Sequence, residues 1–97
     1  MMSLKNGVKH DQEKLRYDLL PWKPIEAVVR VLQLGAVKYS EHNWKKVEGW
    51  RWRYFNAALR HLVAWWCGEQ LDPECGEHHL AHAMCCLLFI MGKEMED

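Results

Sequence analysis

Three segments of this chain carry apolar side chains at intervals of three and four residues, which is the spacing of one face of an α-helix. The segments cover residues 24–39, 50–67 and 77–95, and prolines and glycines separate them. The sequence has no alternating pattern typical of a strand, no internal repeat and no low-complexity segment. It therefore predicts an all-α fold, a small bundle of three main helices in a single domain over residues 1–97.

Each predicted helix has an apolar stripe that we expect to face the core. In residues 24–39 the stripe is Ile25, Val28, Val29, Leu32, Ala36 and Tyr39. In residues 50–67 it is Trp52, Phe55, Leu59, Leu62 and Trp66. In residues 77–95 it is Leu80, Met84, Leu87, Leu88, Met91 and Met95, and alanines beside this stripe predict burial on several sides.

Signals for helix ends support these bounds. Pro24 suits the first turn of the first helix, and Gly68 fits a C-terminal cap of the second. Residues 69–76 form a turn, in which Asp72 before Pro73 has the pattern of an N-cap followed by proline.

Residues 1–22 are predicted to be an N-terminal arm, with the helical core in residues 23–97. Basic and acidic side chains alternate along the arm, and prolines at positions 21 and 24 interrupt any helix that would continue from it. Tyr17, Leu19, Leu20 and Trp22 give the arm an apolar end that we expect to dock on the bundle.

The apolar content is high for so short a chain. Hydrophobic residues make up 49% of the 97 residues, and six are tryptophan. A domain of this size buries a limited surface, so we expect a homo-oligomer. In it, a neighbouring chain would complete any ligand-binding pocket. The net charge is zero, which argues against general nucleic-acid binding but leaves room for a small nucleotide.

The four cysteines contain no CxxC pair, so a zinc ribbon or finger is not expected. They are interpreted as reduced packing residues. Because the first ten residues lack an apolar run, we expect no signal peptide and a cytoplasmic protein. No apolar run reaches the ~20 residues of a membrane span, so no membrane partner is expected.

The richest stretch for chemistry is Arg60 to His82, which lies across the turn between the second and third helices. If these helices are antiparallel about residue 72, His61 lies close to His82. The carboxylates at the turn would then join the imidazoles. Such a cluster could hold Mg²⁺ or Mn²⁺, which in turn could bind phosphate oxygens and activate a water. Arg60 could clamp a phosphate.

Other polar residues could complete a nucleotide pocket. Lys9, Asp11 and Lys14 on the arm could fold over a triphosphate, and Lys38, Tyr39, Asn43 and Trp44 could read and stack on a base. Each group also has a structural interpretation. Carboxylates at a turn are often solvated caps, a histidine on an apolar helix is often a core residue, and the arm has the composition of a solvated tail.

Four blocks of residues resemble a known family. They are KHDQEKLRYDLLP (9–21), GAVKYSEHNW (35–44), ALRHLVAWWCGEQLDPECG (58–76) and HLAHAMCCLLF (79–89). Together they are similar to the phage-associated family of dATP/dGTP diphosphohydrolase N-terminal domains, which is allied to the all-α, MazG-like nucleotide pyrophosphohydrolases.

The resemblance implies hydrolysis of a purine deoxynucleoside triphosphate to monophosphate and pyrophosphate with Mg²⁺ or Mn²⁺. It implies metal or water-activating roles for Glu69, Asp72, Glu74, His79 and His82. The remaining polar pocket would consist of Lys9, Asp11, Lys14, Lys38, Asn43, Arg60 and His61, with His61 also a catalytic candidate.

The chain departs from the family pattern at three places. Glu13 and Ser40 stand where glycine is usual, and the paired E-x-x-E and E-x-x-D helices of MazG-like enzymes are not both present, although Glu69-x-x-Asp72 fits the second. Two alternatives therefore stay open. The protein could bind a linear or cyclic nucleotide without cleaving it, for example as a sponge in phage counter-defence, or it could be a structural helical interaction module.

Overall fold

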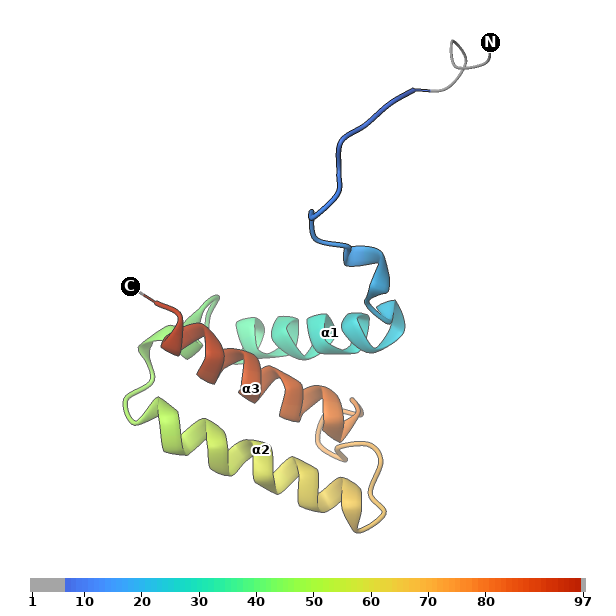
Figure 1. Ribbon diagram of the computed structural model, residues 1–97. Coiled ribbons are helices and arrows are strands. Elements are labelled where there is room, and N and C mark those ends of the chain that lie inside the picture. Colours follow the sequence, from blue (N-terminus) through green and yellow to red (C-terminus); the bar gives the residue numbers. More distant parts are fainter. Residues whose placement is uncertain (1–6, 97) are drawn as a thin grey trace.

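The computed structural model describes residues 7–96, and its regular structure is helical (Figure 1). The elements are a 3-10 turn η2 (Tyr17–Leu19), helix α1 (Trp22–Lys38), a 3-10 turn η3 (Asn43–Lys46), helix α2 (Trp50–Trp66) and helix α3 (His79–Glu94). Within these residues the only β contact is an isolated antiparallel bridge between Leu71 and His78. The predicted all-α bundle of three main helices is confirmed, with each helix end within two residues of the expected position.

The helix ends follow from local chemistry. Gly68 has a φ of 103° and follows the C-terminal end of α2, as predicted. The predicted Asp72 cap is wrong for α3, which begins seven residues later and is capped by the His78 side chain, whose Nδ1 accepts from the Leu80 amide at 3.0 Å. Asp72 instead caps a turn of its own, because its Oδ1 accepts from the Glu74 amide at 2.8 Å.

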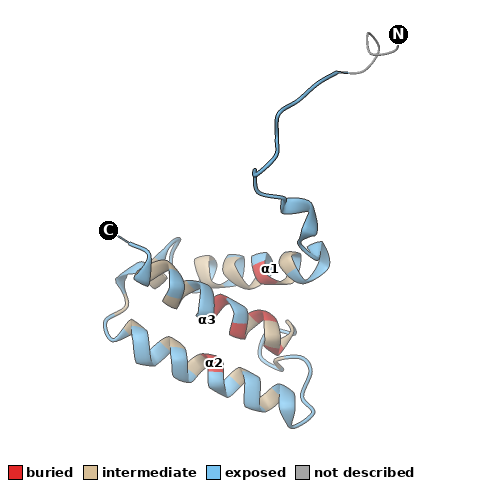
Figure 2. Cartoon of the chain, in the orientation of Figure 1, coloured by how far each residue is buried: buried red, intermediate tan, exposed pale blue. Residues whose placement is uncertain are grey.

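Helix α3 lies between α1 and α2 and supplies most of the buried residues (Figure 2). Toward α1, Ala81 and Cys85 pack against Val28, and the Cys85 thiol donates to the Val28 carbonyl at 3.5 Å. Ala27, Val31, Leu32 and Phe89 pack around this cluster. The expectation that the third helix is buried on several sides is therefore confirmed.

Small side chains, rather than the predicted large ones, form the buried helix faces. On α2 the buried residue is Ala58, whereas Trp52 and Trp66 of the predicted stripe are 64% and 80% exposed. On α3 the buried alanines and cysteines alternate with exposed leucines and methionines of the predicted stripe. The two predicted stripes are wrong as core faces, because alanine lets the helices approach closely and leaves the larger side chains outside the contact.

The far end of α3 is closed by an aromatic cluster. The Trp44 ring of η3 stacks on Phe89, with centroids 5.2 Å apart and an interplanar angle of 12°, and Tyr54 of α2 meets the same Phe89 at 5.1 Å. The Lys93 Nζ donates to the Lys45 carbonyl at 3.2 Å. These contacts attach η3 to α3.

The described part of the N-terminal arm, residues 7–21, projects away from the bundle (Figure 1). The side chains of Tyr17 and Leu19 are exposed, so the expected docking of the arm's apolar end on the bundle is not found. The Cα radius of gyration is 18.5 Å, whereas a compact chain of this length has about 12.5 Å.

No helix within residues 7–96 has both the length and the apolar character that crossing a lipid bilayer requires.

Candidate metal centre

The polar residues of the Arg60–His82 stretch meet where the end of α2 passes the start of α3. The rings of His61 on α2 and His82 on α3 stack with centroids 4.5 Å apart and an interplanar angle of 8°. The predicted proximity of His61 to His82 is therefore confirmed. The loop that joins the two helices, residues 67–78, covers this place from one side.

The loop has a defined shape that positions Asp72. Its ends approach through the Leu71–His78 bridge and a 2.8 Å hydrogen bond from the Asp72 amide to the Glu77 carbonyl. The Gly76 amide donates to the Asp72 carbonyl at 2.7 Å, and the φ of Gly76 is 80°, which few residues other than glycine adopt. The Asp72 side chain is largely buried, and its Oδ2 lies 3.8 Å from Nε2 of His82.

His61, Asp72 and His82 form a group suited to a metal ion. Each offers one ligand atom, and these atoms all lie within 4.8 Å of one another. Burial is the main cause that lowers the pKa of His61 and of His82 below the usual imidazole value. Both rings are therefore neutral at pH 7, which is the form that binds a metal.

His79 lies behind this group and connects it to Glu69. The His79 ring is 5% exposed, and its Nε2 lies 2.6 Å from Oε1 of Glu69, while its Nδ1 lies 2.9 Å from Nδ1 of His61. A carboxylate only accepts, so Nε2 of His79 carries a proton. In a neutral His79 ring Nδ1 is then an acceptor, and Nδ1 of His61 donates to it.

This hydrogen-bonded chain has a consequence for His61. When its Nδ1 carries the proton, the lone pair of the ring is on Nε2, which is the nitrogen left for a ligand. Histidines that bind metals in proteins generally donate their other ring N–H in this way. Glu69 and His79, both predicted as metal ligands, are thus engaged in orienting His61.

Cys75 is the residue of this site that the sequence interpretation did not select. Its thiol lies 3.1 Å from Nε2 of His82, and the residue is exposed. The interpretation of all four cysteines as packing residues is therefore wrong for Cys75 and for the equally exposed Cys67. Its place in the polar turn, three residues after Asp72, was the signal that could have identified it.

Two cations of α1 reach the same loop. Arg30 pairs with Glu77 through its Nε, 3.0 Å from Oε2, and Lys38 Nζ lies 4.0 Å from Oε1 of Glu74. The structure thus brings the predicted residues Lys38 and Glu74 together beside the centre. Lys38 and Glu74 are largely exposed, so both side chains are free to turn toward a ligand.

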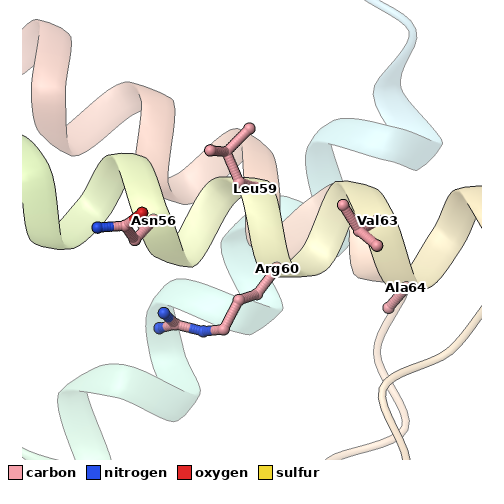
Figure 3. Close-up of a pocket in the computed structure, with 5 residues that line it drawn as sticks. All are labelled: Asn56, Leu59, Arg60, Val63 and Ala64. Atoms are coloured by element: carbon pink, nitrogen blue, oxygen red, sulfur yellow. The ribbon is translucent and has the colours of Figure 1, made fainter.

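Other predicted binding residues lie elsewhere. Arg60 extends beside a shallow depression of about 430 Å³ along α2, which is also lined by Asn56, Leu59, Val63 and Ala64 (Figure 3). Asn43 and Trp44 are in η3, and Trp44 packs on Phe89, about two helical turns beyond His82. Tyr39 is exposed just after α1.

The predicted arm residues are also remote from the centre in this chain. Lys9, Asp11 and Lys14 line a hollow of about 550 Å³ formed by the arm itself. The arm leaves the bundle on the side away from α2 (Figure 1). The structure therefore brings together the histidines, the loop carboxylates and Lys38, and it leaves the arm and η3 apart from them.

The donor set of the centre can be compared with what different metals prefer. Two imidazole nitrogens and one carboxylate oxygen fit Mn²⁺ and softer divalent ions. Mg²⁺ prefers an octahedral shell of oxygens, of which this group of three supplies only the carboxylate.

Comparison with known proteins gives two matches. Residues 5–97 match the family described as dATP/dGTP diphosphohydrolase, N-terminal. A protein of Salmonella phage PMBT28, named dATP/dGTP diphosphohydrolase, is 38% identical over 86 residues, which are 87% of this chain and 28% of that protein. The chain thus spans between a quarter and a third of the length of that relative. No solved structure matches.

Proposed function

This chain belongs to the dATP/dGTP diphosphohydrolase N-terminal family, and from that membership we propose that it hydrolyses a purine deoxynucleoside triphosphate to the monophosphate and pyrophosphate with a divalent metal. The relative's printed name supports the reaction and the purine substrate. The observation that carries the proposal is the convergence of His61, Asp72 and His82 beside two cations and an exposed carboxylate.

His61, Asp72 and His82 would hold the metal, and Mn²⁺ and softer divalent ions fit these three donors. When bound, such an ion supplies positive charge to phosphate oxygens and favours deprotonation of a water. Glu69 and His79 keep the His61 ring in one tautomer and one orientation. Lys38 would turn from Glu74 to a phosphate, where its charge offsets that of the departing pyrophosphate.

Glu74 is our candidate for the general base, because its carboxylate is exposed and its nearest charged partner, Lys38, lies as far as 4.0 Å away. Water would attack the α-phosphorus and lose a proton to Glu74. The bond from that phosphorus to the bridging oxygen breaks, and pyrophosphate leaves.

The test is to incubate the purified protein with each of the four deoxynucleoside triphosphates and Mn²⁺, Zn²⁺ or Mg²⁺, and to measure pyrophosphate. We expect release from dATP or dGTP that disappears with chelator and in Asp72→Ala. Absence of pyrophosphate under every combination would overturn the hydrolase proposal.

A second candidate is nucleotide binding without cleavage. It is favoured by the composition of the metal group, which contains one carboxylate, whereas a MazG-like site is built from two pairs of acidic residues. Calorimetry with linear and cyclic purine nucleotides separates the two candidates. Binding that persists in chelator, with the ligand recovered intact, supports a sponge; turnover of the ligand excludes it.

We also propose that a second copy of the chain covers the exposed face of α2. The chain exposes 8286 Å², whereas a compact protein of 11.5 kDa exposes about 5,800 Å², and the extended arm contributes part of the difference. The α2 face carries Trp52, Phe55, Leu59, Leu62 and Trp66.

Light scattering tests the proposed dimer. A monomer at every concentration would refute it, and Phe55→Glu should dissociate a dimer. If the dimer formed without any effect on nucleotides, the third alternative, a structural interaction module, would be favoured.

A cytoplasmic location is part of the same proposal. The exposed thiols Cys67 and Cys75 are free in the structure, which suits a reducing compartment. Nucleoside triphosphates, the proposed substrates, are also cytoplasmic.

A further inference from the structure

The centre between α2, α3 and the loop combines nitrogen, oxygen and sulfur donors. We propose that it takes a four-coordinate transition metal of the Zn²⁺ class rather than Mg²⁺, with the thiolate of Cys75 as the fourth protein ligand beside His61, Asp72 and His82. This metal assignment rests on the proposed function only in that both proposals use the group of His61, Asp72 and His82.

Three of the carboxylates near the centre are held by contacts that a shell of oxygen ligands around a metal would disturb. Oε1 of Glu69 is engaged with His79 at 2.6 Å, and both oxygens of Glu77 accept from Nε of Arg30 at 3.0 and 3.2 Å. One oxygen of Asp72 accepts from the Glu74 amide. In the group of three, Mg²⁺ would meet two imidazole nitrogens and one carboxylate oxygen. Even if the exposed Glu74 carboxylate turned toward the ion, two of its protein ligands would be nitrogen, which is a poor match to its preference for oxygen.

The Cys75 thiol lies beside the group of His61, Asp72 and His82 rather than within it, and it would have to move toward His61 and Asp72 to supply the fourth donor. Its Sγ lies 3.1 Å from Nε2 of His82, the nitrogen that also faces Oδ2 of Asp72 at 3.8 Å. The hydrogen bonds between Asp72 and the residues at 76 and 77 hold the turn that carries Cys75. Thiolate and imidazole together select Zn²⁺ and Co²⁺ over Mg²⁺ and Mn²⁺.

The other three cysteines do not share this position. Cys85 and Cys86 are buried in α3, and burial raises the pKa of their thiols to about 12 and about 11. Cys67 is also exposed, and it lies at the first position of the loop of residues 67–78, where it caps the C-terminal end of α2. Cys67 is therefore a matched control, since it is another exposed thiol of the same segment.

The environment of His61 supports its role as a metal ligand independently of the thiol. Its Nδ1 is hydrogen-bonded to His79, which is bonded in turn to Glu69. This arrangement would leave the lone pair on Nε2 of His61 for a metal, as the outer contacts of metal-bound histidines generally do. Binding of the metal would release the Cys75 thiol proton to solvent, and the sulfur electron pair would form the bond to the metal.

The experiment is titration of the full chain with Co²⁺, followed by displacement with Zn²⁺, in wild type, Cys75→Ser and Cys67→Ser. We expect intense visible bands of four-coordinate Co²⁺ and a near-ultraviolet sulfur-to-cobalt band in wild type and Cys67→Ser. Cys75→Ser should lose the near-ultraviolet band and bind Zn²⁺ about 100-fold more weakly or worse, since loss of even an outer contact costs 10- to 100-fold. Circular dichroism checks that each variant stays folded.

Three results would overturn the inference. They are a near-ultraviolet band that survives in Cys75→Ser, a weak six-coordinate cobalt spectrum in wild type, and tighter binding of Mg²⁺ than of Zn²⁺ by calorimetry. Hydrolysis with Mn²⁺ or Mg²⁺ that Cys75→Ser leaves unchanged would refute the sulfur ligand and keep the hydrolase. Cobalt bands without hydrolysis of any nucleotide would keep the metal site and refute the hydrolase.

Discussion

The two ends of α3 contact different kinds of side chain, polar at the start and aromatic at the other end. At its start, His79 and His82 join His61, Glu69 and Asp72 in a hydrogen-bonded polar group. At its other end, Phe89 is held between the rings of Trp44 and Tyr54. Two turns of helix separate the polar group from the aromatic cluster. We therefore predict that substitutions in the aromatic cluster leave metal affinity unchanged, and that substitutions in the polar group leave the aromatic packing unchanged.

The largest expected effect is at the polar end. His82→Ala removes one of the imidazoles proposed to bind the metal and should weaken Zn²⁺ or Mn²⁺ binding by about 100-fold or more, since even outer contacts are worth 10- to 100-fold. Calorimetry measures the affinity. His42→Ala, which changes an exposed histidine in the turn before η3, serves as the control. Unchanged affinity in His82→Ala would show that the histidine group is structural.

Phe89→Ala tests the aromatic end. The substitution removes the ring on which Trp44 and Tyr54 pack, and it should lower the free energy of unfolding by about 2–3 kcal/mol, somewhat below the range for a fully buried ring. Denaturant unfolding measures the loss. Metal affinity of the folded variant should stay within about twofold of wild type, and a larger change would break the proposed separation of the two ends.

Glu69→Gln tests the hydrogen-bonded chain behind the metal group. The amide keeps the shape of the side chain but offers a weaker acceptor to His79, so the tautomer of His61 becomes less fixed. We expect about a 10-fold loss of metal affinity with little change in stability. Glu94→Gln, at the exposed end of α3, is the matched control and should bind as wild type does.

Gly92→Ala tests the contact between α3 and Trp44 at the aromatic end of the helix. A Cβ at this position would lie 2.9 Å from Cη2 of Trp44, so the indole must shift. Overpacking costs about 1–3 kcal/mol and the gain in helix propensity is about 1 kcal/mol, so a net loss of about 1 kcal/mol is expected. Gly35→Ala in α1 meets nothing within 4 Å and should stabilise; equal effects of the two would refute the Trp44 contact.

The smallest effect concerns thiol reactivity without metal. Cys67 and Cys75 are exposed and should react with a thiol reagent at pH 7.5–8. Cys85 and Cys86, with thiol pKa values of about 12 and about 11, should react only after unfolding. Mass spectrometry counts the modified residues, and four rapid modifications would show that α3 opens readily.

Much of the fold could be predicted from periodicity, because apolar spacing and the glycine and proline positions define helices locally. The faces that are buried between helices could not be predicted. Periodicity shows that a helix has an apolar face, but it does not show which neighbouring helix covers that face. Ala58 and Ala81 form the contacts, while Trp52 and Trp66 remain outside. An alanine gives a weak hydrophobic signal although it permits the closest approach of two helices.

Part of the candidate site could also be predicted from the spacing of residues along the sequence. An antiparallel turn of known length places His61 beside His82, so that pairing follows from sequence. The engagement of both nitrogens of His79 depends on distances of 2.6 and 2.9 Å, which no spacing rule supplies. The approach of Cys75 to His82 depends on the shape of an irregular loop, which is set by Gly76 and by backbone hydrogen bonds.

The division of the candidate ligands between helix and loop has a consequence for evolution. His61 and His82 belong to helices whose packing fixes them, whereas Asp72 and Cys75 belong to a short connection between Gly68 and Gly76. Residues in such a connection can be exchanged at little cost to the bundle. Relatives with this scaffold could therefore change their metal through substitutions at two loop positions, while both histidines are retained.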